Sequence, residues 1–136
     1  MSRSDFVVVV VVLLTGIMVY FSSCKVRNET NPPEVSFINN VGFVYADTTL
    51  YRGTNFTIWV FATKAGLNDL LESGKITRRI NNGPDTTLTT FTFVSTQFSQ
   101  YYSYILGDSG TATTYTFTFG NENGVTTSDS VKITAN

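Results

Sequence analysis

The sequence predicts an all-β fold, a two-sheet antiparallel sandwich of about seven strands. Three observations predict it. From residue 34 onward, apolar and polar side chains alternate in short runs, which is the period of a half-buried strand. Gly, Asn, Asp and Pro separate these runs, as turn residues do. Charged residues make up only 14% of the chain while Thr and Ser are abundant, and such a polar surface suits strands better than helices.

Each strand is expected where such an alternating run occurs. In order, the expected strands are 35–38, an interrupted strand made of 41–45 and 48–51, then 56–64, 75–80, 88–95, 98–106, 114–119 and 125–133. The strongest is 56–64, because its even-numbered residues from Phe56 to Ala62 are all apolar and form one face. Residues 65–74 carry leucines at a spacing that allows one helical turn. The expected turns and loops are 53–55, 81–84, 107–111 and 121–124, the last closing a hairpin.

The start of the chain differs from the rest. Residues 6–21 are almost wholly apolar, follow Arg3 and precede Ser22-Ser23-Cys24, a pattern typical of an export signal in helical form. A helix of this length spans roughly 24 Å, less than the roughly 30 Å of a bilayer core, so a retained transmembrane span is the weaker interpretation. A plain secretory signal would have a small residue where Phe21 stands.

The only cysteine lies at this junction. Cys24 resembles the lipid-accepting residue of bacterial lipoproteins, although Phe21 stands where their signals usually have Leu, Val or Ile. The resemblance implies a signal peptide over residues 1–23, acylation of Cys24 and stable membrane anchoring through the attached chains. Residues 24–33 then form a polar, lipidated tether that ends in two prolines, and residues 34–136 form the domain. Lipidation also accounts for a single cysteine in an exported chain, because the thiol is not free to pair.

The closing stretch carries a second resemblance. Asp108-Ser109-Gly110 followed by Tyr115-Thr116-Phe117 resembles the tyrosine corner of immunoglobulin-like domains. Residues 114–134 are similar to the last hairpin of PKD-like bacterial domains. This implies an immunoglobulin-like sandwich in which the Tyr115 hydroxyl bonds backbone beside the preceding loop. Together with Cys24, the chain resembles single-domain immunoglobulin-like lipoproteins of the Bacteroidota type.

Enzyme signatures are mostly missing, so we expect no catalytic activity, no cofactor and no metal. The chain has no histidine, which removes the commonest general base and metal ligand. It also has no nucleophile elbow, phosphate loop or zinc spacing. A net charge of −1 without a basic stripe argues against nucleic acid as a partner. A glycosidase-like carboxylate pair or a calcium site stays open as the less favoured interpretation of the loop acids Asp47, Asp85, Asp108, Glu122 and Asp129.

Three Asp-Ser/Thr segments match the O-glycosylation pattern of Bacteroidota-type envelope proteins. Their candidate acceptors are Thr48, Thr86 and Ser130. The competing interpretation is that Asp-Thr simply favours turn entry in a Thr-rich protein.

Aromatic side chains give the remaining functional hint. Trp59 and Phe61 lie on the strand face opposite the apolar residues from Phe56 to Ala62, and so are expected to point outward. Tyr101, Tyr102 and Tyr104 are expected to extend them into a ligand platform of the kind that sugar-binding sandwiches use. The alternative is that Trp59 packs at a strand crossing or under residues 65–74.

These observations predict a lipid-anchored, immunoglobulin-like domain of the bacterial cell envelope with a structural, adhesive or binding role. A carbohydrate-binding accessory lipoprotein is the first alternative, and a carboxylate-based glycoside hydrolase is the second. The partners expected are the membrane, through the anchor, and an unidentified protein or glycan. Lys25 and Arg27 directly follow the cysteine, where surface-exported lipoproteins tend to be acidic. This favours the periplasmic side of the outer membrane over the cell surface.

Overall fold

The computed structural model describes residues 31–67 and 69–136. The expected signal peptide, Cys24 and most of the tether lie outside these residues. Two sheets form a β-sandwich, and the described residues contain no helix. The all-β, two-sheet prediction is therefore confirmed. No helix among the described residues is long and apolar enough to cross a membrane.

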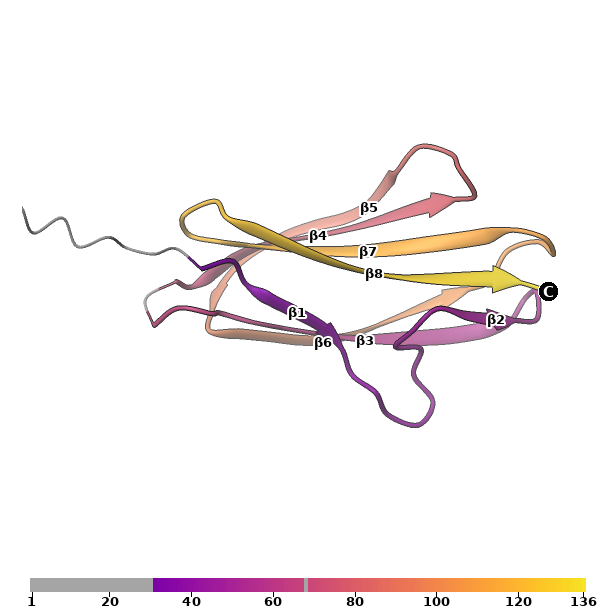
Figure 1. Ribbon diagram of the computed structural model, residues 1–136, viewed down its shortest axis with the longest axis horizontal. Helices are drawn as coiled ribbons and strands as arrows, with labels where there is room; N and C mark the ends of the chain where they lie inside the picture. Colours follow the sequence, from indigo (N-terminus) through magenta and orange to yellow (C-terminus); the bar gives the residue numbers. More distant parts are fainter. Residues whose placement is uncertain (1–30, 68) are drawn as a thin grey trace, which may run out of the picture.

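Eight strands make up the two sheets (Figure 1). Their bounds are β1 Glu34–Phe37, β2 Thr48–Leu50, β3 Asn55–Thr63, β4 Leu71–Ile80, β5 Thr86–Ser95, β6 Gln97–Ile105, β7 Ala112–Asn121 and β8 Thr126–Ala135. The smaller sheet has the order β1-β3-β6, and the larger has the order β2-β8-β7-β4-β5. All neighbours pair antiparallel except β2, which runs parallel to β8.

The core lies between the sheets because β3 and β7 each turn their apolar residues toward the other. In β3, Ile58, Val60 and Ala62 have no exposed surface. In β7, Phe117 is fully enclosed and contacts Phe37 and Tyr102 at ring-centroid distances of 5.5 and 5.6 Å. Thr114, Thr116 and Thr118 of β7 alternate with the buried rings and are only part-buried, as the sequence predicted.

One end of the core is made of phenylalanine rings around a glycine. Phe91 and Phe98 are stacked 5.2 Å apart, and Phe119 lies 5.0 Å from Phe98. Gly74 pairs with both Phe91 and Phe119, so the three residues form one row across the larger sheet. A Cβ atom built on Gly74 would lie 2.2 Å from the ring of Phe91. The ring therefore occupies the space that any larger residue at position 74 would need.

Two segment predictions were wrong. The described residues of the segment, 65–67 and 69–74, contain no helical turn, and β4 already begins at Leu71, which is buried and pairs with Asn121 and Ser95. Residues 41–45 form no strand. They belong to a loop that returns to β3 through one hydrogen bond, from Val44 N to Thr57 O at 2.9 Å.

The end of the expected tether contacts the domain. Pro33 is buried, and the Asn31 carbonyl accepts a hydrogen bond of 3.3 Å from Asn121 Nδ2. The chain therefore enters the sandwich beside the β7–β8 turn, at one end of its long axis (Figure 1).

Candidate functional site

The candidate site lies on the solvent face of the smaller sheet and consists of Phe43, Trp59 and Tyr101, called here the aromatic patch. Trp59 and Tyr101 meet edge to face with ring centroids 5.4 Å apart. Phe43 lies 5.4 Å from Trp59 and stacks on Tyr101 at 5.8 Å. Each ring thus contacts the other two, and none of the three is fully buried. Such geometries are favourable for aromatic side chains beyond the area they bury.

Strand register brings Trp59 and Tyr101 together. They are direct cross-strand partners in β3 and β6, whose outward positions they occupy. Phe43 comes from the loop between β1 and β2. Hydrogen bonds from Ile38 N to Trp59 O and from Val44 N to Thr57 O hold the two sides of this loop against β3.

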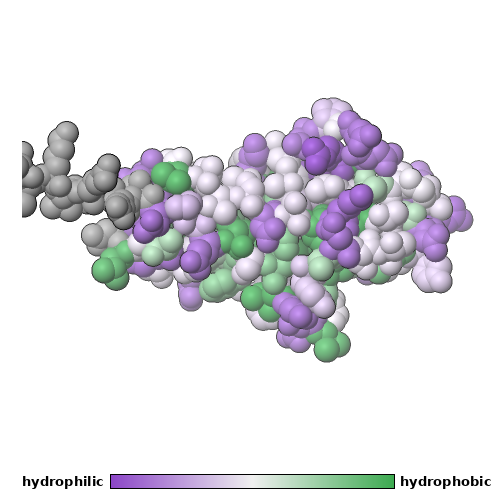
Figure 2. All heavy atoms as spheres, in the orientation of Figure 1, coloured by the Kyte–Doolittle hydropathy of each residue, from purple (hydrophilic) through white to green (hydrophobic). Residues whose placement is uncertain are grey.

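The loop projects beyond the sheet and carries apolar side chains at its tip. Val41 is 95% exposed and Tyr45 is 46% exposed. Figure 2 shows apolar surface on the protrusion that joins β1 to β2. The aromatic patch therefore sits beside a raised apolar edge rather than on a flat sheet.

Hydroxyl groups surround the patch. The Trp59 indole donates from Nε1 to Ser99 Oγ at 2.8 Å, which fixes the ring orientation. Thr57 Oγ1 and Ser103 Oγ lie 2.9 Å apart on the next cross-strand pair. All the outward residues of β6 are uncharged. The site therefore offers ring faces and neutral hydroxyls, and no carboxylate or ammonium group stands among them on this strand.

Two of the expected platform residues point the other way. Tyr102 pairs with the fully buried Ile58, and Tyr104 pairs with Phe56, so both face the core. Their inclusion in the platform was wrong, because successive residues of a strand alternate between faces. Burial raises the pKa of both hydroxyls, and for Tyr104 the neighbouring Tyr115 and Tyr102 raise it further. Both tyrosines therefore stay protonated at neutral pH.

Phe61 faces outward as expected, but it stands beside the aromatic patch rather than in it. Its cross-strand partners are Ser36 in β1 and Ser99 in β6. Phe43, in contrast, was missed by sequence reasoning. Its only sequence signal is an apolar run that was assigned to a strand, and nothing in that run shows which ring it will contact.

Tyr115, the expected corner residue, is buried in β7 and stacks on Tyr104 with ring centroids 4.3 Å apart. Burial raises the pKa of its hydroxyl, and the nearby Arg78 guanidinium, by its charge and by a hydrogen bond, lowers it in part. Bonding of this hydroxyl to backbone stays a prediction.

The three candidate glycosylation acceptors lie in different settings. Thr86 is exposed at the start of β5, next to Asp85, which lies 3.9 Å from Arg79. Thr48 is part-buried in the short β2. Ser130 is exposed but lies in the middle of β8, where its backbone N–H bonds Asp129 Oδ1 at 2.8 Å. Thr86 and Ser130 are therefore both exposed, and of these two only Thr86 lies at the end of a strand.

Acidic side chains form no metal-binding group among the described residues. Residues 31–67 and 69–136 contain no group of three or more Cys, Asp or Glu able to hold a metal ion. Of five surface hollows on this part of the chain, none is lined by two carboxylates.

Comparison with known proteins gives no family for this chain. No protein-family model matches it, and no curated protein matches its sequence significantly. Among solved structures, Spo0M, a sporulation control protein from Bacillus subtilis, is 10% identical with a TM-score of 0.42, over 78% of this chain and 51% of Spo0M. A β-glucosidase from Listeria innocua in complex with glucose is 6% identical with a TM-score of 0.45, over 76% of this chain and 16% of that enzyme. The chain thus spans about half the length of Spo0M and a smaller part of the glucosidase.

Proposed function

We propose that this protein is a binding module of the bacterial cell envelope, anchored by lipid on Cys24 and folded as an immunoglobulin-like sandwich. The observation that carries the binding role is the aromatic patch, three mutually packed and partly exposed rings, two from the smaller sheet and one from the loop between β1 and β2. Exposed, clustered aromatic side chains mark interaction surfaces in soluble domains. Each of five surface hollows on the described residues is lined by at most one carboxylate, whereas glycoside hydrolysis needs two acids in one cleft, so these hollows favour binding.

The strand arrangement supports the immunoglobulin-like part of the proposal. A three-stranded sheet packs on a five-stranded one, and a short strand near the start of the domain pairs parallel with the last strand. The final hairpin, β7 and β8, lies in the middle of the larger sheet with β4 beside it. Immunoglobulin-like sandwiches likewise place their last two strands side by side in one sheet with an earlier strand next to them.

The anchor is tested on the protein purified from its native cell. Intact mass spectrometry is expected to show a chain that begins at Cys24 and carries acyl groups. Cys24→Ser is expected to leave the membrane fraction, because acyl chains anchor a protein where a polar tether alone cannot. A Ser23→Ala variant serves as the control and is expected to stay membrane-bound. An unmodified thiol, or an uncleaved residue 1–23 segment in the native protein, would contradict the proposed anchor.

A neutral carbohydrate is the ligand class that the aromatic patch favours. Sugar rings present C–H faces that pack on aromatic rings, and hydroxyls that bond side chains such as Ser99 and Ser103 around the patch. The outward face of β6 carries no charge to match an ionic ligand.

We place this module in the outer membrane, with the periplasmic side favoured.

Trp59→Ala is expected to weaken glycan binding by about 10- to 100-fold, since truncating a central aromatic anchor usually costs this much. A glycan array identifies the ligand, and titration calorimetry measures its dissociation constant. Tyr51→Ala removes another exposed ring, 76% accessible and outside the aromatic patch, and is expected to bind as the wild type does. Equal losses in the two variants, or no glycan bound by the wild type, would refute the carbohydrate assignment.

A further inference from the structure

A second surface, on the larger sheet, combines two cations with a hydroxyl. Arg79 in β4 pairs with Thr114 in β7, and Thr114 pairs in turn with Lys132 in β8. The three residues therefore form one row across three adjacent strands, and all lie on the solvent face. With strands spaced about 4.8 Å apart, the two cationic residues lie roughly 10 Å from each other at the backbone. We call this set the basic row.

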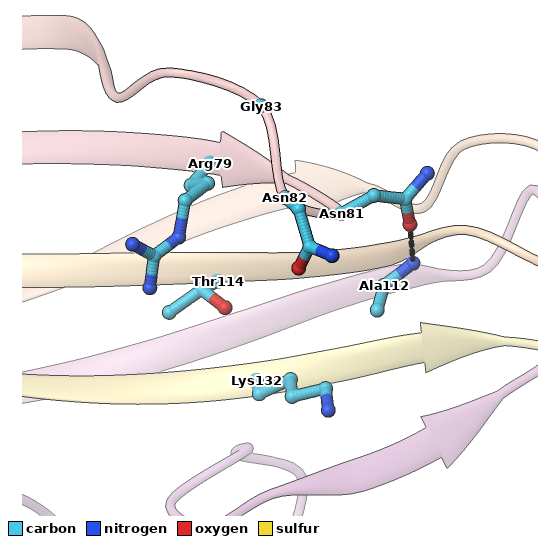
Figure 3. A pocket seen from close by; sticks show the side chains of 7 residues that line it. All are labelled: Arg79, Asn81, Asn82, Gly83, Ala112, Thr114 and Lys132. Atoms are coloured by element: carbon cyan, nitrogen blue, oxygen red, sulfur yellow. Dashed lines mark hydrogen bonds between the residues drawn. The ribbon is translucent and has the colours of Figure 1, made fainter.

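The turn after β4 makes a wall over the basic row. Asn81 donates its backbone N–H to the Ala112 carbonyl at 2.6 Å, and its Oδ1 accepts from Ala112 N at 2.8 Å. Its φ of 51° lies in the left-handed region, which asparagine tolerates better than most residues. These contacts hold the turn beside the start of β7 and place Asn82 above the row (Figure 3).

The result is a hollow of about 550 Å³ lined by polar and cationic groups. Its lining residues are Arg79, Asn81, Asn82, Gly83, Ala112, Thr114 and Lys132. Figure 3 shows the Arg79 guanidinium and the Asn82 amide directed into the space over Thr114, with Lys132 on the next strand. No carboxylate lines this hollow, although the chain as a whole has a net charge of −1.

Two acids, Asp85 and Asp47, lie near the basic row, but neither is among the residues that line the hollow. Asp85 lies 3.9 Å from Arg79 Nε, a long contact between side chains that are each about half-exposed. Such exposed ion pairs contribute little to stability. The contact is made by Nε, so the two terminal nitrogens of the guanidinium can still bind an anion. Asp47 accepts from the backbone N–H of Lys132 at 2.8 Å, and within the described residues no carboxylate lies within 4 Å of the Lys132 ammonium.

We propose that the hollow over the basic row binds the carboxylate or sulfate group of an acidic glycan. The planar guanidinium matches the geometry of such oxyanions, the ammonium adds charge, and Thr114 and Asn82 add neutral donors. Arg79 stands at the end of β4 remote from Asn31, where the tether enters. If Cys24 is anchored as proposed, the hollow faces away from the bilayer, so a glycan fits better than a lipid headgroup. The preference for a glycan over a lipid headgroup rests on the proposed anchor. The oxyanion site itself does not depend on that anchor.

The test uses the full chain in a non-ionic detergent and a sulfated, uronate-containing disaccharide as the probe, followed by NMR titration. Shifts are expected at Arg79, Asn82, Thr114 and Lys132, and binding is expected to weaken as salt rises. Arg79→Gln combined with Lys132→Gln is expected to weaken binding at least about tenfold. Thr114→Val keeps the shape of the row but removes its hydroxyl, and is expected to weaken binding by about threefold.

Lys75→Gln is the matched control, because Lys75 lies on the same face of β4 and pairs with Thr118, outside the hollow. It is expected to bind within about twofold of the wild type. An equal loss in Lys75→Gln, equal binding of the uncharged disaccharide, or no saturation by about 20 mM probe would overturn the site. Tighter binding to anionic lipid vesicles through the same residues would overturn the glycan assignment. Trp59→Ala leaves this titration unchanged, so failure of the aromatic patch is distinguishable from failure of the basic row.

Discussion

Phe117→Ala is expected to lower the free energy of unfolding by about 3–5 kcal/mol, the largest effect of any single change considered for this domain. Phe117 has no exposed surface and lies between the sheets, where it meets Phe37 from the smaller sheet and Tyr102 from β6. Truncation removes both the transfer free energy of the ring and its contacts, and the surrounding strands are too firmly paired to close the cavity. Urea denaturation followed by circular dichroism measures the change.

Phe61→Ala is the matched control. It removes the same atoms from the outward face of β3, where the ring is only part-buried. We expect Phe61→Ala to lower the free energy of unfolding by less than about 1 kcal/mol, because the Phe61 ring points away from the other sheet. If the two variants lost similar stability, the assignment of Phe117 to the centre of the core would be wrong.

Gly74→Val is expected to cost about 1–3 kcal/mol, through overpacking rather than a cavity. The new side chain would overlap the Phe91 ring, which is itself held by Phe98 at 5.2 Å and by Phe119 at 6.1 Å. The ring must leave this cluster, so its contacts are lost together with the favourable packing at that end of the core. Thermal unfolding gives the change in midpoint.

The test is repeated with Gly74→Val introduced into a chain that already carries Phe91→Ala. Phe91→Ala removes the three atoms that lie nearest to a Cβ at position 74, so Gly74→Val is expected to cost less in this background and the two changes are strongly non-additive. Gly107→Ala is a control glycine, since its Cβ would approach no atom closer than 3.8 Å. Additive effects of Gly74→Val and Phe91→Ala would show that the ring does not occupy the space above the glycine.

The sequence predicts most of this fold because most strands carry their own signal. The alternation of Tyr115, Phe117 and Phe119 with threonines determines both the strand and its buried face, and the structure has the same faces. The prediction for residues 65–74 was wrong because the leucine spacing over so short a stretch cannot distinguish a helical turn from the start of a strand. There the pairing partners of Leu71, distant in sequence, decide the outcome.

The candidate sites were less predictable, for a different physical reason. Strand parity alone separates Tyr101 from Tyr102 and Tyr104, so the error there was avoidable. Phe43 joins the aromatic patch from a loop whose path depends on tertiary hydrogen bonds to β3. The basic row depends on the registers between β4, β7 and β8, and nothing local to Arg79, Thr114 or Lys132 reveals that they are neighbours.

The placement of the chain ends has a mechanical consequence. The first strand, β1, begins at Glu34 at one end of the sandwich's long axis, and Asn136 lies at the other end (Figure 1). If the N-terminal end is held by the proposed anchor and a force acts on the opposite end of the sandwich, the force is directed along the strands. It then acts on the hydrogen bonds between strands, including those between the parallel strands β2 and β8. Bonds strained in this direction rupture together rather than one after another. Resistance to pulling then depends on how fast the chain unravels, not on its equilibrium stability.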